Sequence, residues 1–221
     1  MTIDPTLLQQ IETAISTVVG PGVGSFSSAS DLFEAYIFSI VLDAARAEGA
    51  TIEFRDVAGK LAQRLVLRSS PGHIYSTVQP YTHAVISFSG KNALEIHIGV
   101  RVAGKSGVLH ECDVAVIDQD EADTCRFQQV PPRSYRVLVA VECKFYSTLL
   151  QLNLGRSFIG LTTDVSAKRT FFVTNTSSES IERLLTRRKK AWERNVVPAS
   201  NLEVTRLKNA FQQCFRDYKV S

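Results

Sequence analysis

The predicted fold follows from two short segments of the chain: Glu111-Cys112-Asp113-Val114-Ala115-Val116-Ile117 and Val139-Ala140-Val141-Glu142-Cys143-Lys144-Phe145-Tyr146. Both are rich in β-branched and apolar residues, so both are expected to be buried strands. Each nevertheless contains acidic residues, and a buried charge is costly unless it has a partner. Residues two apart on a strand share a face, so Glu142 and Lys144 project the same way. If the two strands pair, Asp113 joins them in one half-buried patch.

A patch of two carboxylates and one ammonium suits a hard divalent cation. Such a cation takes oxygen ligands, and the lysine beside it can orient or deprotonate a water. The alternative is a structural ion pair on a sheet edge, which is at best neutral for stability compared with apolar residues. Three ionisable groups in two apolar strands therefore favour a chemical role. Glu111 shares a face with Asp113 and is an alternative ligand.

This pattern resembles the active site of the PD-(D/E)xK nucleases, the restriction-endonuclease-like superfamily. An Asp on one strand is followed by Glu-x-Lys on the next, although Cys112 stands where the eponymous motif has proline. The resemblance implies that Asp113 and Glu142 ligate Mg²⁺ or Mn²⁺. It also implies that the backbone carbonyl of Cys143 is a further ligand and that Lys144 positions the attacking water.

The resemblance further implies roles for residues on two helices. Many relatives have an acidic residue on the core helix, here Glu34, which faces the site and holds a second metal or a water. The alternative for Glu34 is a glutamate favoured near a helix start by capping or by the helix dipole. Gln151 and Arg156 resemble the polar and basic residues with which relatives hold the scissile phosphate. Either of these two could equally be a surface residue.

Hydrophobic periodicity predicts the same order of elements that the resemblance implies. We predict a buried helix over 31–48, strands over 85–88, 94–102, 111–117, 136–146 and 170–174, and a helix over 147–161. A hairpin turn is expected at 104–107 and a polar loop over 118–133. Residues 50–81 show no clear pattern, and 57–67 fit a strand or a helical turn. The expected fold class is α/β, with an αβββαβ core, a mixed central sheet and flanking helices.

Additional helices are expected on both sides of this core in a single domain of 221 residues. We assign residues 1–24 to an amphipathic helix with a glycine-rich hinge, 31–174 to the nuclease core, and 175–221 to basic helices. The latter are predicted over 178–195 and 203–218. The apolar faces of the first and last helices either cover the sheet or form a two-fold dimer contact.

Composition and motifs exclude several classes of protein. The chain is 44% hydrophobic and 21% charged, as is usual for soluble globular proteins. It has no apolar stretch approaching the ~18 residues of a membrane helix and no signal-peptide pattern at its start, so a cytoplasmic location is expected. Its four cysteines form no C-x2-C pair, so they predict no zinc site. Its four histidines are scattered along the chain. Neither a nucleophile elbow nor a P-loop occurs.

Together these features predict a Mg²⁺- or Mn²⁺-dependent endodeoxyribonuclease, which by family analogy would serve a bacterial restriction or phage-defence system. DNA is the expected partner, and a homodimer or a subunit of a larger defence complex is the expected assembly. The net charge of +3 is compatible with nucleic acid, and basic residues crowd 183–194. One alternative is a catalytically idle nucleic-acid-binding or scaffold protein of the same fold. Another is a nuclease acting on RNA or on repair junctions.

Overall fold

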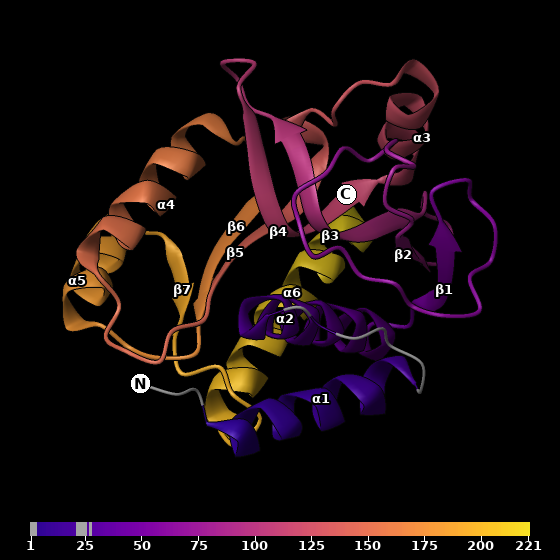
Figure 1. The fold of residues 1–221 in the computed structure, drawn as a ribbon. Coiled ribbons are helices and arrows are strands. Elements are labelled where there is room, and N and C mark those ends of the chain that lie inside the picture. Colours follow the sequence, from indigo (N-terminus) through magenta and orange to yellow (C-terminus); the bar gives the residue numbers. More distant parts are fainter. Residues whose placement is uncertain (1–3, 21–25, 27) are drawn as a thin grey trace.

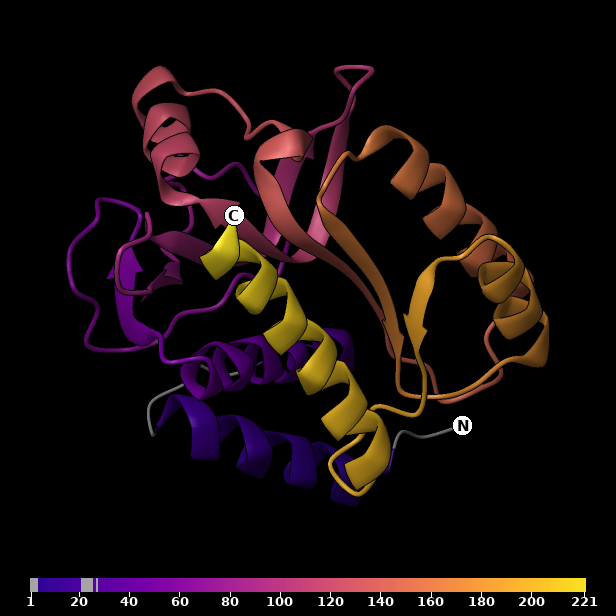
Figure 2. The same cartoon turned by 180° about the vertical axis from the view of Figure 1, so that it is seen from behind.

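The central feature of the fold is one mixed β-sheet with helices on both faces (Figures 1 and 2). The computed structural model describes residues 4–20, 26 and 28–221, and in these residues the sheet has seven strands. Each strand pairs with its neighbour in sequence, in the order β1-β2-β3-β4-β5-β6-β7. This confirms the predicted α/β class with a mixed sheet flanked by helices.

The elements alternate along the chain as follows. The helices are α1 (Pro5–Val19), α2 (Ala29–Ala47), α3 (Gln119–Gln128), α4 (Leu152–Asp164), α5 (Glu179–Arg187) and α6 (Asn201–Val220), with a short 3₁₀ helix at Ser134–Arg136. The strands are β1 (Thr51–Asp56), β2 (Thr82–Ser87), β3 (Leu94–Ala103), β4 (Leu109–Asp118), β5 (Val137–Lys144), β6 (Arg169–Thr174) and β7 (Ala191–Glu193).

The type of strand pairing changes once across the sheet, from antiparallel to parallel. Strands β1 to β5 run antiparallel to their neighbours, whereas β5, β6 and β7 are parallel. Helix α4 makes the crossover between β5 and β6, because a parallel pair cannot be joined by a tight turn. From α2 onward, the chain therefore contains a helix, the meander β3-β4-β5, a helix and a parallel strand, with β1, β2 and α3 as additions.

Alternate residues of the strands face two different hydrophobic layers. On β6, Phe171 and Val173 pack with α1, α2 and α6, whereas Phe172 packs with α4 and α5. Because side chains alternate across a strand, these two helix groups cover opposite faces. Figure 2 shows α6 crossing the first of these faces. Its Phe211 contacts Phe171 edge to face, with ring centroids 5.0 Å apart.

The terminal helices use their apolar faces within the chain. Ile11 and Ile15 of α1 are buried, and so are Leu207, Phe211 and Phe215 of α6. Of the two alternatives predicted for these faces, the structure shows the first, in which both cover the core. Asp4 caps α1, and residues 21–24 of the glycine-rich hinge predicted within 1–24 lie outside the described residues.

The polar segment 118–133, predicted as a loop, instead contains helix α3. The prediction was wrong because α3 buries few residues, namely Glu121, Ala122 and Cys125, and has no apolar stripe. Its buried carboxylate, Glu121, accepts hydrogen bonds from the backbone N–H and the guanidinium of Arg133 at 2.9 and 2.8 Å. A long-range ion pair therefore supports a helix that hydrophobic periodicity does not reveal.

Three other boundaries differ from the prediction. The basic segment 178–195 is not one helix, because α5 ends at Arg187 and the chain turns at Lys189 (φ 54°) into β7. Helix α4 begins at Leu152 and not at residue 147, so a loop separates Lys144 from it. The unassigned region after residue 50 begins with strand β1, an edge strand that is only partly buried.

Candidate functional site

Strand β4 separates from β5 at Asp113. Pairing between the two strands ends at Val114 and Val141, while β4 continues beyond this point as a hairpin with β3. Where the ladder stops, Oδ2 of Asp113 accepts a hydrogen bond of 2.6 Å from the backbone N–H of Cys143. The Asp113 carboxylate thus takes the place of a backbone carbonyl as the acceptor for the Cys143 N–H. This hydrogen bond fixes the carboxylate where β4 and β5 separate. Asp113 is 6% exposed.

Lys144 lies between the two carboxylates that the sequence assigns to the site. Its Nζ is 2.6 Å from Oε1 of Glu142 and 3.6 Å from Oδ2 of Asp113. Glu142 and Lys144 are both partly buried, and they project together from the end of β5. The structure therefore brings Asp113 of β4 together with Glu142 and Lys144 of β5. Asp113 and Glu142 are 29 residues apart in the sequence.

The cluster carries more negative than positive charge. Burial, and then the charge of Glu142, raises the pKa of Asp113 to about 7, although Lys144 and the Cys143 N–H act in the opposite direction. Burial and Glu142 also raise the pKa of Glu111, which is the residue proposed from sequence as an alternative ligand. In the protein without a cation, these carboxylates are therefore held in a position that disfavours their ionised form.

Glu34 faces the same cluster from α2. Burial, followed by the charges of Asp113 and Glu111, raises the pKa of Glu34 to about 9. The helix cap is made elsewhere, because the Oγ of Ser28 accepts the N–H of Asp31 at 3.1 Å. The cap lies six residues before Glu34, so capping does not explain Glu34.

Aromatic packing holds this part of α2 against the end of β5. The ring of Phe33 lies 5.5 Å from that of Phe145, which directly follows Lys144. Such a pair contributes beyond its buried area. Phe33, which precedes Glu34 on α2, therefore contacts Phe145, which follows Lys144 at the end of β5. This contact does not depend on any charge interaction.

Gln151 and Arg156 lie at the start of α4 and are exposed. Gln151 occupies the N-cap position without capping the helix through its side chain. Within the described part of the chain, neither side chain makes a hydrogen bond or ion pair, so only the position of these residues beyond Lys144 links them to the cluster.

A surface hollow adjoins the end of β5. It is lined by residues that follow β5 and β6: Tyr146, Ser147, Thr148, Leu149, Asn175 and Thr176. Two of these residues are joined by hydrogen bonds. The side chain of Asn175 accepts the backbone N–H of Tyr146 at 2.8 Å and donates to the carbonyl of Tyr146 at 2.9 Å. The hollow therefore begins two residues beyond Lys144 along the chain.

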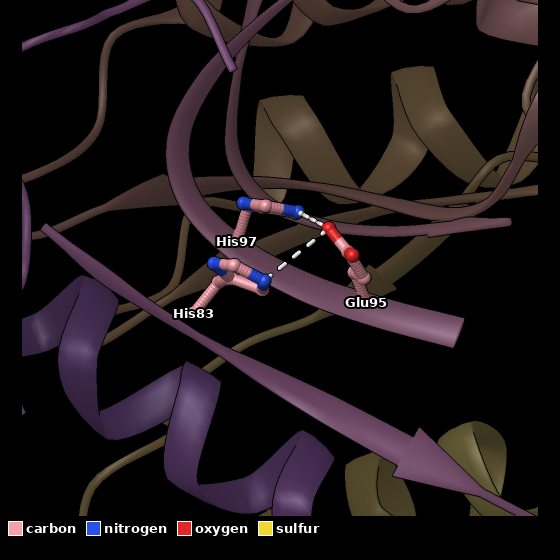
Figure 3. A group of neighbouring side chains, drawn as sticks. All are labelled: His83, Glu95 and His97. Carbon is pink, nitrogen blue, oxygen red and sulfur yellow. Dashed lines mark hydrogen bonds and ion pairs between the residues drawn. The ribbon is translucent and has the colours of Figure 1, made fainter. Parts of the chain in front are cut away.

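Two of the four histidines also come together in the structure, away from this cluster. His83 and His97 lie on the neighbouring strands β2 and β3 and share Glu95 (Figure 3). The histidines are scattered along the sequence, which does not reveal the register of β2 against β3 that brings these two together. The only local signal is the spacing of Glu95 and His97, which places both on one face of a strand.

Three kinds of comparison with known proteins found no match. No family model, no curated protein and no solved structure matches the chain. Among the helices that the structure describes, none is both long and apolar enough to cross a membrane.

Proposed function

We propose that the protein is a divalent-cation-dependent nuclease of the PD-(D/E)xK type that hydrolyses phosphodiester bonds in DNA. The observation that carries this proposal is the convergence of Asp113, Glu142 and Lys144 where β4 leaves β5. The order of α2, the β3-β4-β5 meander, α4 and β6 supports it, because the resemblance implies that order. A role in a restriction or phage-defence system rests on the resemblance alone.

The residues of the cluster fit a hard cation. Asp113 and Glu142 would hold it, with the carbonyl of Cys143 as a further oxygen ligand, and oxygen is the donor that Mg²⁺ and Mn²⁺ prefer. The excess of carboxylates around Asp113 also fits, since a divalent cation would neutralise the repulsion that raises their pKa values. Glu34 would hold a second ion or a water, as the resemblance implies.

The reaction is an in-line hydrolysis in which a water oxygen bonds to phosphorus, the opposite ester bond breaks, and the leaving oxygen takes up a proton. The bound cation would polarise the phosphate and lower the pKa of the attacking water. Asp113 is fixed for this role by the N–H of Cys143. Lys144, held as an ammonium by Glu142, donates hydrogen bonds that orient the water and stabilise charge developing on the phosphate.

The surroundings of the cluster supply surfaces for the substrate. The hollow beside Tyr146 and Asn175 opens at the end of β5, and Gln151 and Arg156 present exposed polar groups at the start of α4. At the other end of the parallel strands, the turn 187–190 that leads into β7 carries four consecutive cationic residues. Exposed cations of this kind bind the phosphate backbone without reading sequence.

The direct test is incubation of supercoiled plasmid with the purified protein in Mg²⁺, in Mn²⁺ and in EDTA. We expect nicked or linear products with either cation and none in EDTA. The Asp113→Asn variant, purified in the same way, should give none under any condition, which excludes a contaminating nuclease. The proposal fails if the wild type leaves DNA intact with both cations. DNA that is bound but not cut would instead support the idle nucleic-acid-binding alternative.

A further inference from the structure

A second polar cluster is buried between β2 and β3. It consists of His83, Glu95 and His97, of which none is more than 1% exposed (Figure 3). Glu95 and His97 project from one face of β3, and His83 lies two residues before Val85, the strand partner of Glu95. Buried ionisable groups are rare unless they are paired or bind a metal, so this cluster requires a chemical explanation.

The ligand-type atoms of the cluster converge on one point. Nε2 of His97 lies 2.9 Å from Oε2 of Glu95, and Nε2 of His83 lies 3.5 Å from the same oxygen. All three atoms are within 4.8 Å of one another. The two imidazole rings are stacked, with centroids 4.8 Å apart and planes 19° apart, so that both rings present Nε2 to Glu95 (Figure 3).

Hydrogen bonds within the described residues do not account for this arrangement. Neither ring nitrogen of His83 has a hydrogen-bond partner, although the residue is 1% exposed, and Nδ1 of His97 also has none. Buried polar atoms are nearly always paired, and an unpaired one costs about 1–3 kcal/mol. His83 therefore directs an unsatisfied nitrogen at Glu95, which is the arrangement expected of a ligand that has a further partner.

We propose that His83, Glu95 and His97 form a binding site for a divalent transition metal, with Zn²⁺ as the best-fitting ion. Zinc binds imidazole nitrogen and carboxylate oxygen at about 2.0–2.2 Å, which places tetrahedral ligand atoms roughly 3.3–3.5 Å apart. The separations of 2.9 and 3.5 Å from Oε2 of Glu95 lie near this value. Imidazole ligands favour zinc over magnesium, so this site and the oxygen-rich Asp113 cluster would select different metals.

Arg126 completes the surroundings of the proposed ligand Glu95. Its guanidinium donates to both carboxylate oxygens of Glu95, at 2.5 and 2.9 Å, from helix α3. Metal-binding carboxylates are usually held by such outer hydrogen bonds. Three protein ligands leave a fourth position for a buried water. Since the cluster is closed to solvent, the metal would stabilise the packing of β2, β3 and α3 and would not act in the proposed hydrolysis.

The test uses the Asp113→Asn variant, which removes the oxygen-rich cluster as a competing site. After equilibrium dialysis against Zn²⁺ with excess Mg²⁺, we expect one zinc per chain and a higher melting temperature than in EDTA. Adding His83→Leu should abolish both effects. The difference in melting temperature between Zn²⁺ and EDTA, measured for each variant, separates zinc binding from the loss of the contacts of His83 with Glu95 and His97. Adding His73→Gln, at a histidine outside the cluster, should leave zinc binding intact.

Two results would overturn the proposal: no zinc bound by Asp113→Asn, or undiminished binding after His83→Leu. X-ray absorption at the zinc edge gives a second measurement that does not depend on how the double variant folds. We expect two imidazole nitrogens and oxygen ligands in the first shell. Sulfur ligation would place the metal on a cysteine and would contradict the assignment.

Discussion

Replacing Asp113 by asparagine should stabilise the metal-free protein at alkaline pH. The pKa of Asp113 is raised from 3.8 to about 7, chiefly by burial and by Glu142. A raised carboxyl pKa means that the folded chain binds more protons than the unfolded chain between these values. Stability is therefore lost as the pH rises from about 4 to about 7, and the full penalty is present above pH 7. Asparagine cannot ionise and avoids this penalty.

The expected size follows from the same values. Each pKa unit corresponds to about 1.4 kcal/mol, so the ionised Asp113 costs up to about 4 kcal/mol above pH 7. Rearrangement around Lys144 and residual structure in the unfolded chain reduce this figure, and we expect a gain of about 1–4 kcal/mol for Asp113→Asn at pH 9. At pH 4 the two proteins should be about equally stable. The amide oxygen of asparagine can still accept the N–H of Cys143.

Urea denaturation in EDTA at pH 4 and pH 9 measures this difference. Saturating Mg²⁺ should stabilise the wild type at pH 9, by about 2.7 kcal/mol at a hundred times the dissociation constant, and should have no effect on Asp113→Asn. The control is Asp123→Asn, at an exposed aspartate with a surface ion pair to Arg126, which should change stability by less than about 1 kcal/mol. If Asp113→Asn destabilises the protein at pH 9, Asp113 is a structural ion-pair partner and the reasoning is refuted.

Three further predictions concern the metal and the fold. Magnesium affinity should rise with pH up to about 7, by up to about tenfold per pH unit, because magnesium binding displaces the proton of Asp113. Calorimetry in two buffers of different ionisation enthalpy should detect this proton release. An affinity that does not depend on pH would contradict the prediction. Phe211→Ala should lower the free energy of unfolding by about 3–5 kcal/mol in urea titrations, because the ring is fully buried against Phe171, and a loss below about 1 kcal/mol would be inconsistent with that packing. Gly99→Ala should lower the free energy of unfolding by about 1–2 kcal/mol in thermal denaturation. Gly99 has a φ of 57°, and an added Cβ would lie 3.5 Å from the carbonyl oxygen of Ser70. An unchanged melting temperature would argue against this backbone conformation.

Local patterns in the sequence were sufficient to predict the centre of the sheet. The alternation over 94–102 and the apolar segments around Asp113 and Glu142 correspond to β3, β4 and β5. The spacing of Glu142 and Lys144 was enough to predict their common direction, because side chains alternate along a strand. The proximity of Asp113 to Lys144 required the pairing of β4 with β5, which the sequence allowed only as an assumption.

Features that depend on long-range contacts were not predictable in the same way. Helix α3 is polar and is supported by the ion pair of Glu121 with Arg133, which are 12 residues apart. Strand β7 has three residues and exists because it pairs with β6. The cluster around Glu95 depends on the register of β2 against β3. Propensity and periodicity describe neighbours along the chain, so they do not reveal such partners.

The central claim is that Lys144 acts on the reaction and not on substrate binding. The most direct measurement compares DNA affinity and the single-turnover cleavage rate of Lys144→Ala with those of the wild type, in Mg²⁺. The control is Lys60→Ala, at an exposed lysine beyond β1. We expect Lys144→Ala to bind DNA nearly as tightly as the wild type while its cleavage rate falls by about 10²–10⁴-fold, as is typical when a positioned catalytic group is removed. Cleavage by Lys144→Ala at the wild-type rate would contradict the proposed mechanism.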